Sequence, residues 1–274
     1  MPELTRIHPT AIVDAGADVA PGVVIGPYCL VGPAVAIGQG SEIGAHVVLE
    51  GRVRLGERCR VGHGALIGGA PQDFKYREGL SVGVSIGDDT VIREYVTVHR
   101  ATHDGHDTRI GSRCLVMVSS HVAHDCVVGD EVIIINYAGL TGHVTVEDRA
   151  TIGGLTGIHP FTRIGAYAYV GGCSKVTQDV PPFVMADGVP AVARAVNVIG
   201  MRRGGVDGVG GDEGHQAGAG QDNAAADEIG SQFVHGAAHA FLGGLVADAE
   251  HLAHFASGLA FEIAQQQRVA LALV

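Results

Sequence analysis

Residues 25–44 read IGPYCLVGPAVAIGQGSEIG, and an aliphatic residue followed by glycine returns there at every sixth position. The aliphatic spacing extends from Ile7 to Ile67 without exception. It resumes at Ile86 and continues to Val176, with Asp104 as the one non-aliphatic residue in the series. A fixed period of six residues predicts a repeat architecture in which each unit stacks on the next.

Two interruptions break this spacing, at residues 69–85 and at about residues 101–109. In the regular units the fifth residue is small, so one branched and one small side chain of each unit point inward. If three units close a triangular coil of 18 residues, the 27 positions of the series make nine coils. We therefore expect an all-β fold, a parallel β-helix of short strands joined by tight corners, with loops where the spacing breaks.

The composition narrows the functional classes. Glycine supplies 42 of 274 residues, and 18 basic against 29 acidic side chains give a net charge of −11. This charge argues against a protein that neutralises the phosphates of nucleic acid or anionic lipid, so we expect no nucleic-acid partner. We find no apolar run long enough for a membrane span and no secretion signal, and we expect a soluble, cytoplasmic protein.

The five cysteines form no disulfide or metal-binding pattern. Their number is odd, and no CxxC pair is present. Four of them, at positions 29, 59, 114 and 126, fall in the small inward position of the repeat. We therefore expect these four to be buried core residues without a catalytic role.

The chain divides into three parts. We expect Pro181 and Pro182 to stop the strand pairing of the repeat. The parts are then a β-helix over residues 1–182, a connecting segment over 183–203 and a Gly/Ala-rich C-terminal extension over 204–274. We expect residues 204–223 to be a flexible linker, and apolar residues recur at helical spacing from about Ala224.

Histidines are the main departures from the repeat. His124 and His143 are separated by one coil plus one position, and His159 follows a little less than one coil later. The stacking of coils predicts that these side chains lie along one edge, near His121. Imidazole titrates near neutrality, so a histidine in such a cluster suits the work of a general base.

A metal centre is the alternative use of these histidines. Three imidazoles from adjacent coils can hold Zn²⁺, as in a gamma-type carbonic anhydrase. However, His121 and His124 are three residues apart, and such residues of an extended strand point to opposite sides unless a corner lies between them. We therefore expect no metal, and metal analysis of the purified protein separates the two alternatives.

Several local strings resemble one enzyme family. They are PQDFKY at 71–76, VHR at 98–100, HVAHDC at 121–126, GH at 142–143, GGCS at 171–174 and QDVPP at 178–182. In this order they resemble the UDP-N-acetylglucosamine O-acyltransferases, a family of hexapeptide-repeat acyltransferases, and the similarity covers residues 1 to about 203. The resemblance implies that the β-helix is left-handed.

The resemblance also implies roles for individual residues. His124 would be the general base that deprotonates the sugar 3-hydroxyl, with the acid Asp125 beside it, and the Gly142 N–H would stabilise the oxyanion. The substrate-binding positions would be Gln72, Asp73, Lys75, His121, His143 and His159 in the pocket, Asn197 and Arg203 at the nucleotide, and Gly172 at the acyl groove. Three positions depart from the family pattern: Pro160, Ile199 and Gly204.

The implied reaction moves a 3-hydroxyacyl chain from acyl carrier protein to the 3-hydroxyl of UDP-N-acetylglucosamine, the first step of lipid A biosynthesis. It requires no cofactor, and the family is homotrimeric with sites between subunits. Gly172 stands where a bulky residue would close the acyl groove, which implies a long donor of about 14 carbons.

Two alternatives to this enzyme remain besides the metal β-helix. The related UDP-acylglucosamine N-acyltransferase carries a uridine-binding domain before its β-helix, for which hexads that begin at residue 7 leave no room. A non-catalytic β-helix such as an ice-binding protein would need regular threonine ladders, whereas the outward positions here are mixed.

Overall fold

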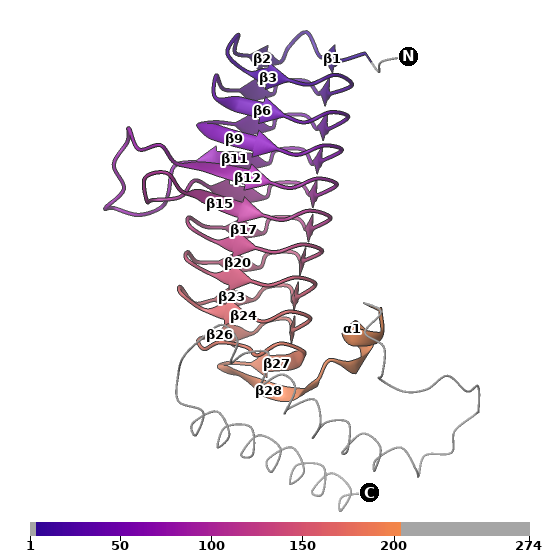
Figure 1. Ribbon diagram of the computed structural model, residues 1–274, viewed down its shortest axis with the longest axis vertical. Helices are drawn as coiled ribbons and strands as arrows, with labels where there is room; N and C mark the ends of the chain where they lie inside the picture. The colour runs from indigo at the N-terminus through magenta and orange to yellow at the C-terminus, as the bar shows by residue number, and fades with distance from the viewer. Residues whose placement is uncertain (1–3, 204–274) are drawn as a thin grey trace, which may run out of the picture.

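Short strands stack into a single three-sided column in the computed structural model, which describes residues 4–203 (Figure 1). Sheet A contains β1 (Arg6–Ile7), β4 (Val24–Ile25), β7 (Glu42–Ile43), β10 (Arg60–Val61), β13 (Val91–Ile92), β16 (Leu115–Val116), β19 (Ile133–Ile134), β22 (Thr151–Ile152), β25 (Tyr169–Val170), β27 (Val184–Gly188) and β28 (Ala191–Val196). Sheet B contains β2 (Ile12–Val13), β5 (Leu30–Val31), β8 (Val48–Leu49), β11 (Leu66–Gly69), β14 (Thr97–His99), β17 (His121–Val122), β20 (Gly139–Leu140), β23 (Gly157–Ile158) and β26 (Lys175–Val176). Sheet C contains β3 (Asp18–Val19), β6 (Val35–Ile37), β9 (Arg52–Leu55), β12 (Gly83–Ile86), β15 (Asp107–Ile110), β18 (Val127–Val128), β21 (Thr145–Val146) and β24 (Arg163–Ile164).

The aliphatic series forms the core, as the period predicts. Ile25 pairs with Ile43, and Ile43 with Val61, through parallel strands that are one coil apart. All three side chains are buried. Each buried aliphatic residue therefore packs between identical positions of the coils above and below, which is how a solenoid builds a continuous core from two-residue strands.

The small inward position also behaves as predicted. Cys29, Cys59, Cys114 and Cys126 are buried and form no disulfide. Burial raises the pKa of Cys114 and Cys126 to about 11, so these thiols stay protonated near neutral pH. Cys173 is exposed.

One position of the aliphatic series is assigned wrongly by the sequence. Ile86 pairs directly with Ile110 across β12 and β15, so the coil between them holds extra residues and Asp104 is not a core position. Asp104 is exposed in a loop, where its Oδ1 accepts the Ser81 N–H at 2.6 Å. Val180 forms a bridge with Ile164 and supplies a further buried position of sheet C.

The corners use left-handed backbone at residues other than glycine. His46 and His143 have φ angles of 58° and 53°, and the same conformation recurs from coil to coil along each edge of the column. A left-handed residue costs roughly 1–2 kcal/mol in an L-peptide. Hydrogen bonds offset this conformational cost, because such corner residues donate their N–H to a carbonyl of the preceding coil. His46 donates to the Pro27 carbonyl at 2.9 Å, and His143 donates to the His124 carbonyl at 3.0 Å.

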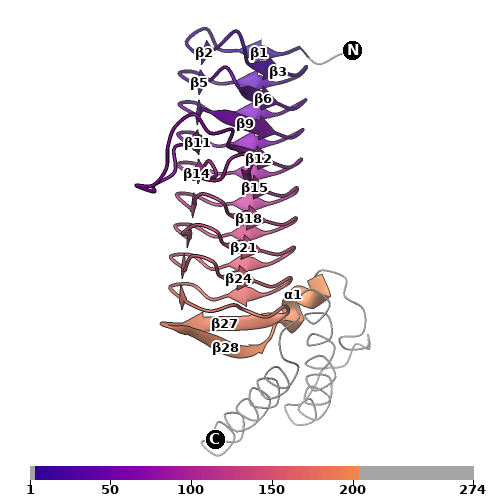
Figure 2. The same cartoon turned by 60° about the vertical axis from the view of Figure 1, so that its left-hand side comes forward.

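The two interruptions form loops that leave the column on the same side (Figures 1 and 2). The strands extend into both predicted interruptions, so the loops are shorter than expected at their ends. They comprise residues 70–82, between β11 and β12, and residues 100–106, between β14 and β15. Ser81 of the first loop donates its N–H to Asp104 Oδ1 of the second at 2.6 Å. Arg52 Nη2 donates to the Ser81 carbonyl at 3.1 Å and lies 2.7 Å from Oδ1 of Asp107 in β15. The loops thus pack as one unit over the edge between sheets B and C.

Strand pairing continues past the two prolines, contrary to the expectation that they stop it. In β27, Met185 pairs with Tyr169 in parallel, and β27 and β28 then form an antiparallel hairpin. Proline removes only its own N–H, so the chain resumes pairing shortly afterwards. Helix α1 (Val198–Arg203) follows, and the predicted C-terminal extension at 204–274 lies outside the described residues. Within residues 4–203 no helix is long and apolar enough to cross a membrane.

Candidate active site

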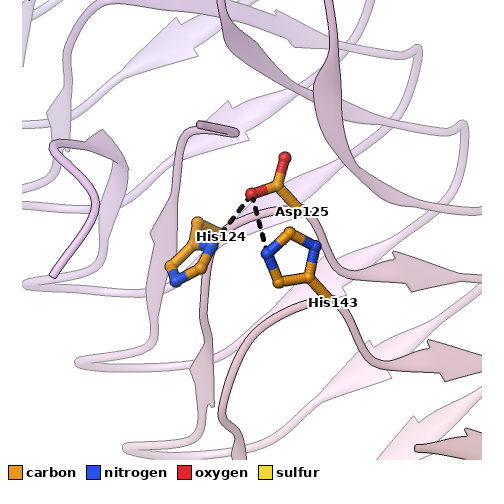
Figure 3. Close-up of side chains that lie close together, drawn as sticks. All are labelled: His124, Asp125 and His143. Carbon is orange, nitrogen blue, oxygen red and sulfur yellow. Dashed lines mark hydrogen bonds and ion pairs between the residues drawn. The ribbon is translucent and has the colours of Figure 1, made fainter. Parts of the chain in front are cut away.

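His124 and Asp125 form a hydrogen-bonded pair at the corner between β17 and β18 (Figure 3). His124 Nδ1 lies 2.9 Å from Asp125 Oδ2, and the two side chains are 14% and 8% exposed. Adjacent residues of a strand would point apart, but Asp125 has a φ of 58° and turns the chain. The corner therefore brings together two side chains that strand alternation would separate.

The Asp125 carboxylate is fixed by the second loop. The Thr102 hydroxyl donates to Oδ2 at 2.6 Å, and the Thr102 N–H lies 3.1 Å from each oxygen. Burial raises the pKa of Asp125, but the hydrogen bonds from Thr102 and His124 outweigh it and hold the pKa at about 2. An ionised carboxylate favours the proton of His124 on Nδ1, which leaves Nε2 as the basic nitrogen.

His143 lies one coil further along the same edge (Figure 3). Its ring centroid is 5.1 Å from that of His124, as the spacing of one coil plus one position predicts, and its Nε2 is 3.7 Å from Asp125 Oδ2. The ring stacks on Phe161 at a centroid distance of 4.5 Å, which fixes its plane. Burial lowers the pKa of His143, so its neutral form is favoured.

Gly142 lies directly against the His124 ring. Its φ is +115°, and a Cβ at this position would come within 3.0 Å of His124 Cε1 and 3.1 Å of Nε2. Among the described residues, no backbone carbonyl accepts a hydrogen bond from the Gly142 N–H. The site therefore offers a basic nitrogen and a backbone donor side by side.

Comparisons with known proteins identify the family of the chain. The sequence matches the family model of the bacterial transferase hexapeptide over residues 34–69 and that of UDP-N-acetylglucosamine O-acyltransferase, domain 2, over residues 179–209. It is 48% identical to the acyl-[acyl-carrier-protein]–UDP-N-acetylglucosamine O-acyltransferase of Burkholderia orbicola over 219 residues, 73% of this chain and 76% of that protein. The chain belongs to the UDP-N-acetylglucosamine O-acyltransferase family.

The share of each chain that is aligned differs among the other relatives. The Synechocystis protein with the same description is 48% identical over 143 residues, so the chain spans about half of that relative, 51% of its length. The solved structure of LpxA from Acinetobacter baumannii is 45% identical, with a TM-score of 0.70 over 73% of this chain and 77% of that one. This likeness confirms the predicted fold class, a left-handed parallel β-helix.

His121, a residue that the family resemblance assigns to the pocket, lies beside the cluster of His124, Asp125 and His143 rather than within it. Its Nδ1 is 2.7 Å from the Thr97 hydroxyl, and its ring packs edge-on against His99 at 4.8 Å. Burial lowers the pKa of His121, and it lowers that of His99 to about 4. These two neutral imidazoles thus extend the site across the outer face of sheet B.

The predicted residues of the first loop lie close to the same edge. Gln72 and Lys75 are exposed, and the Lys75 N–H donates to Asp73 Oδ1 at 2.8 Å. The Asp73 charge acts on His143, where it partly opposes the lowering of the pKa by burial. The loop therefore presents a carboxylate to the histidines and an ammonium to solvent.

The remaining predicted positions lie nearer the C-terminal end. His159 is exposed, with its Nδ1 3.2 Å from the Pro160 carbonyl, and Arg203 is exposed at the end of α1. Asn197 is buried and caps α1: its Oδ1 accepts the Gly200 N–H at 3.0 Å, and its Nδ2 donates to the Tyr167 carbonyl. The side chain of Asn197 therefore has a structural function in this chain.

Gly172 does not need left-handed backbone. Its φ lies outside the positive region, and the left-handed residue of that corner is its neighbour Cys173, with a φ of 59°. A Cβ at Gly172 would meet the Gly154 carbonyl oxygen at 3.3 Å, and the position is otherwise exposed. The glycine therefore leaves open space on the surface instead of serving as a turn residue.

Two residues of the second loop are part of the site but escape the sequence analysis. Thr102 holds the carboxylate, and His103 places its Nδ1 3.4 Å from Asp125 Oδ1 and its ring 5.7 Å from that of His143. Neither residue belongs to the repeat, so the periodicity of the repeat does not predict where their side chains lie. The available signal was the interruption itself, because a loop inserted beside a histidine edge is positioned to cover it.

Proposed function

We propose that the protein transfers a 3-hydroxyacyl chain from acyl carrier protein to the 3-hydroxyl of UDP-N-acetylglucosamine, the first step of lipid A biosynthesis. The names of the Burkholderia orbicola and Synechocystis relatives support both substrates. The observation that carries the proposal is the His124–Asp125 pair, 2.9 Å apart, beside a Gly142 N–H that is bonded to no backbone carbonyl of the described residues.

In this mechanism His124 is the general base. Asp125 orients the ring through Nδ1, so Nε2 takes the proton of the sugar hydroxyl as its oxygen attacks the thioester carbonyl. The C–S bond then breaks, and the imidazolium returns the proton to the departing thiolate. The negative Asp125 beside His124 stabilises the transient positive charge.

Gly142 serves as the oxyanion donor. The tetrahedral intermediate carries negative charge on the former carbonyl oxygen, and a backbone N–H that needs no reorganisation is suited to stabilise it. Glycine suits this position because its φ of +115° is strained for any other residue, and a Cβ would also lie 3.0 Å from His124 Cε1. No cysteine nucleophile is needed, and the buried Cys126 has a pKa raised to about 11 by burial.

The surrounding residues would bind the two substrates. Lys75 suits the diphosphate or the phosphopantetheine, while Asp73 and His143 suit the hydroxyls of the sugar. We assign Gln72, His121, His159, Asn197 and Arg203 to the same pocket on the family resemblance. Asn197 would contact the nucleotide only if its cap on α1 opens, which makes it the weakest of these assignments.

We also infer a homotrimer in the cytoplasm, where nucleotide sugars and acyl carrier protein are made. Val91, Leu115 and Ile133 are aligned partners on the outer face of sheet A and are half-buried in the single chain. An apolar row on a flat sheet is suited to pack against a second copy. Sedimentation velocity of the full chain tests this, and a monomer would contradict it.

For the acyl chain we propose a long donor. Each buried CH₂ contributes about 0.8 kcal/mol, so a groove left open by Gly172 for four more carbons favours the longer chain by up to about 3 kcal/mol. Gly172→Met should shift the preference towards shorter donors while total activity is retained. Competition between 10- and 14-carbon donors measures this, and an unchanged ratio in an active variant rejects it.

The decisive experiment is a direct assay of the full chain with UDP-N-acetylglucosamine and 3-hydroxyacyl-acyl carrier proteins. The proposal predicts an ester at the sugar 3-hydroxyl, detected by mass spectrometry, and its loss in His124→Ala. Transfer to UDP-3-O-acylglucosamine instead would indicate the related N-acyltransferase. Hydration of carbon dioxide by the protein would indicate the metal β-helix.

A further inference from the structure

Four metal-binding side chains converge on the edge between sheets B and C. His124, Asp125 and His143 offer ligand atoms that all lie within 4.8 Å of one another (Figure 3). His103 approaches the same carboxylate from the loop, with its Nδ1 3.4 Å from Asp125 Oδ1. Three imidazoles and one carboxylate form a donor set that Zn²⁺ prefers.

The spacing of these atoms suits tetrahedral coordination. Zn–N and Zn–O bonds place neighbouring ligand atoms about 3.3 Å apart around a tetrahedral ion. The distances from Asp125 oxygens to the three histidines bracket this value, at 2.9 Å for His124 Nδ1, 3.4 Å for His103 Nδ1 and 3.7 Å for His143 Nε2. Small side-chain movements would therefore bring the donors of His124, Asp125 and His143 onto one ion, and a rotation of the exposed His103 side chain would add the fourth.

The groups around the cluster hold its donors in place. Thr102 fixes the Asp125 carboxylate through its hydroxyl and N–H, and Phe161 fixes the plane of the His143 ring. Such outer contacts orient metal ligands in known sites. An ion can reach the cluster from solvent, because the His103 side chain is 65% exposed while His143 is 25% exposed.

We propose that His103, His124, Asp125 and His143 bind Zn²⁺ reversibly and that the bound ion inhibits the enzyme. The carboxylate supplies negative charge to the ion, and the imidazoles supply the nitrogen donors. Coordination through Nδ1 would take Asp125 from His124 and leave the ring proton on Nε2, so this nitrogen could no longer accept the proton of a substrate hydroxyl. The metal thus competes with the catalytic use of the same pair, on which the proposed function rests, and has no part in the reaction.

The binding test uses the full, metal-free chain and Zn²⁺ alone, without substrates. Isothermal titration should show one more Zn²⁺ bound by the wild type than by His143→Asn, and His103→Val should bind that ion at least tenfold more weakly. Co²⁺ should give the visible absorption of a tetrahedral site in the wild type and lose it in both variants. Mg²⁺, which prefers octahedral oxygen ligands, should not compete.

A matched control exists on another edge of the column. His46 also has left-handed backbone and also stacks on an aromatic ring, that of Tyr28, at 5.0 Å. His46→Asn therefore makes the same chemical change in the same backbone setting and should leave Zn²⁺ binding unchanged. The five histidines beyond residue 203 are present in every variant, so differences among the variants report the cluster alone.

Two results would overturn the proposal. Equal Zn²⁺ stoichiometry and affinity in the wild type and His143→Asn would show that the cluster holds no ion. Unchanged affinity in His103→Val would show that the loop histidine is not a ligand. In the acyl-transfer assay, Zn²⁺ that fills the site should stop turnover and EDTA should restore it. Because binding is measured without substrate, failure of the proposed reaction leaves that result intact.

Discussion

Two edges of the column have the same backbone and opposite chemistry. The histidine edge carries Asp125, His143 and Phe161, and the ion-pair edge carries Arg113, Glu131 and Arg149, all with φ angles of 53° to 65°. On the ion-pair edge the side chains reach each other in solvent, as Arg113 Nη2 and Glu131 Oε1 do at 3.1 Å while 54% and 36% exposed. On the histidine edge Asp125 is only 8% exposed.

The difference arises from the loop at residues 100–106. Glu131 donates its N–H to the Ser112 carbonyl of the coil before, the usual corner bond. Asp125 donates instead to the Thr108 hydroxyl, and Thr102 covers its carboxylate. The two edges therefore share the same corner backbone, and the inserted loop buries the Asp125 carboxylate on one of them and fixes its orientation.

The largest expected effect comes from the core that both edges share. Ile152→Asp would bury a carboxylate without a partner, which costs several kcal/mol against a stability of about 5 to 15. We expect no soluble, cooperatively melting protein. Thr145→Asp on the outer face of β21, in sheet C and away from the proposed trimer face, is the control and should fold. A cooperative thermal transition in Ile152→Asp would mean that the assigned core is wrong.

The second effect separates the two edges directly. His124→Ala should lower the transfer rate by roughly 10² to 10⁴, because the general base is lost, while the melting temperature changes little. Arg113→Ala on the ion-pair edge should leave both nearly unchanged, because exposed ion pairs contribute little. Steady-state rates and thermal melts measure the contrast. Activity within threefold of the wild type in His124→Ala removes this residue from the mechanism.

The third effect concerns pH and the buried His99. Burial lowers its pKa from 6.5 to about 4 in the folded chain, so between these values the unfolded chain takes up a proton that the folded chain does not. Stability should therefore fall as pH drops from 6.5 to 4, by up to about 3 kcal/mol. Urea unfolding at several pH values should show a shallower decline in His99→Gln. The exposed His8→Gln is the control, and equal slopes in all three proteins would contradict the expectation.

The smallest effect tests the loop that distinguishes the edges. Thr102→Val removes the hydroxyl that orients Asp125 but keeps the side-chain volume. We expect kcat to fall about tenfold with KM nearly unchanged, because a positioning contact and not a substrate contact is lost. Thr102→Ser should restore most of the rate. A change confined to KM would place Thr102 at the substrate instead.

The repeat made most of the fold predictable, because each core residue has the same neighbours one coil away. It also predicted that His124 and His143 meet, since one coil and one further position return the chain to the same edge. Asp125 was harder, because alternation along a strand does not hold at a left-handed corner. Thr102 and His103 were beyond reach, since a loop outside the repeat has no periodic position.

The corner hydrogen bond from His143 to His124 shows how such a protein can change in evolution. The backbone N–H of such a corner residue bonds to the coil before it, so its partner is set by its position along the chain and not by distant packing. A loop inserted at a corner, such as residues 70–82, therefore preserves the strand register of the coils on both sides of it. The direct pairing of Leu55 with Ile86 demonstrates this. Loss of a single residue within a coil, in contrast, would turn every later outward side chain of that coil towards the core.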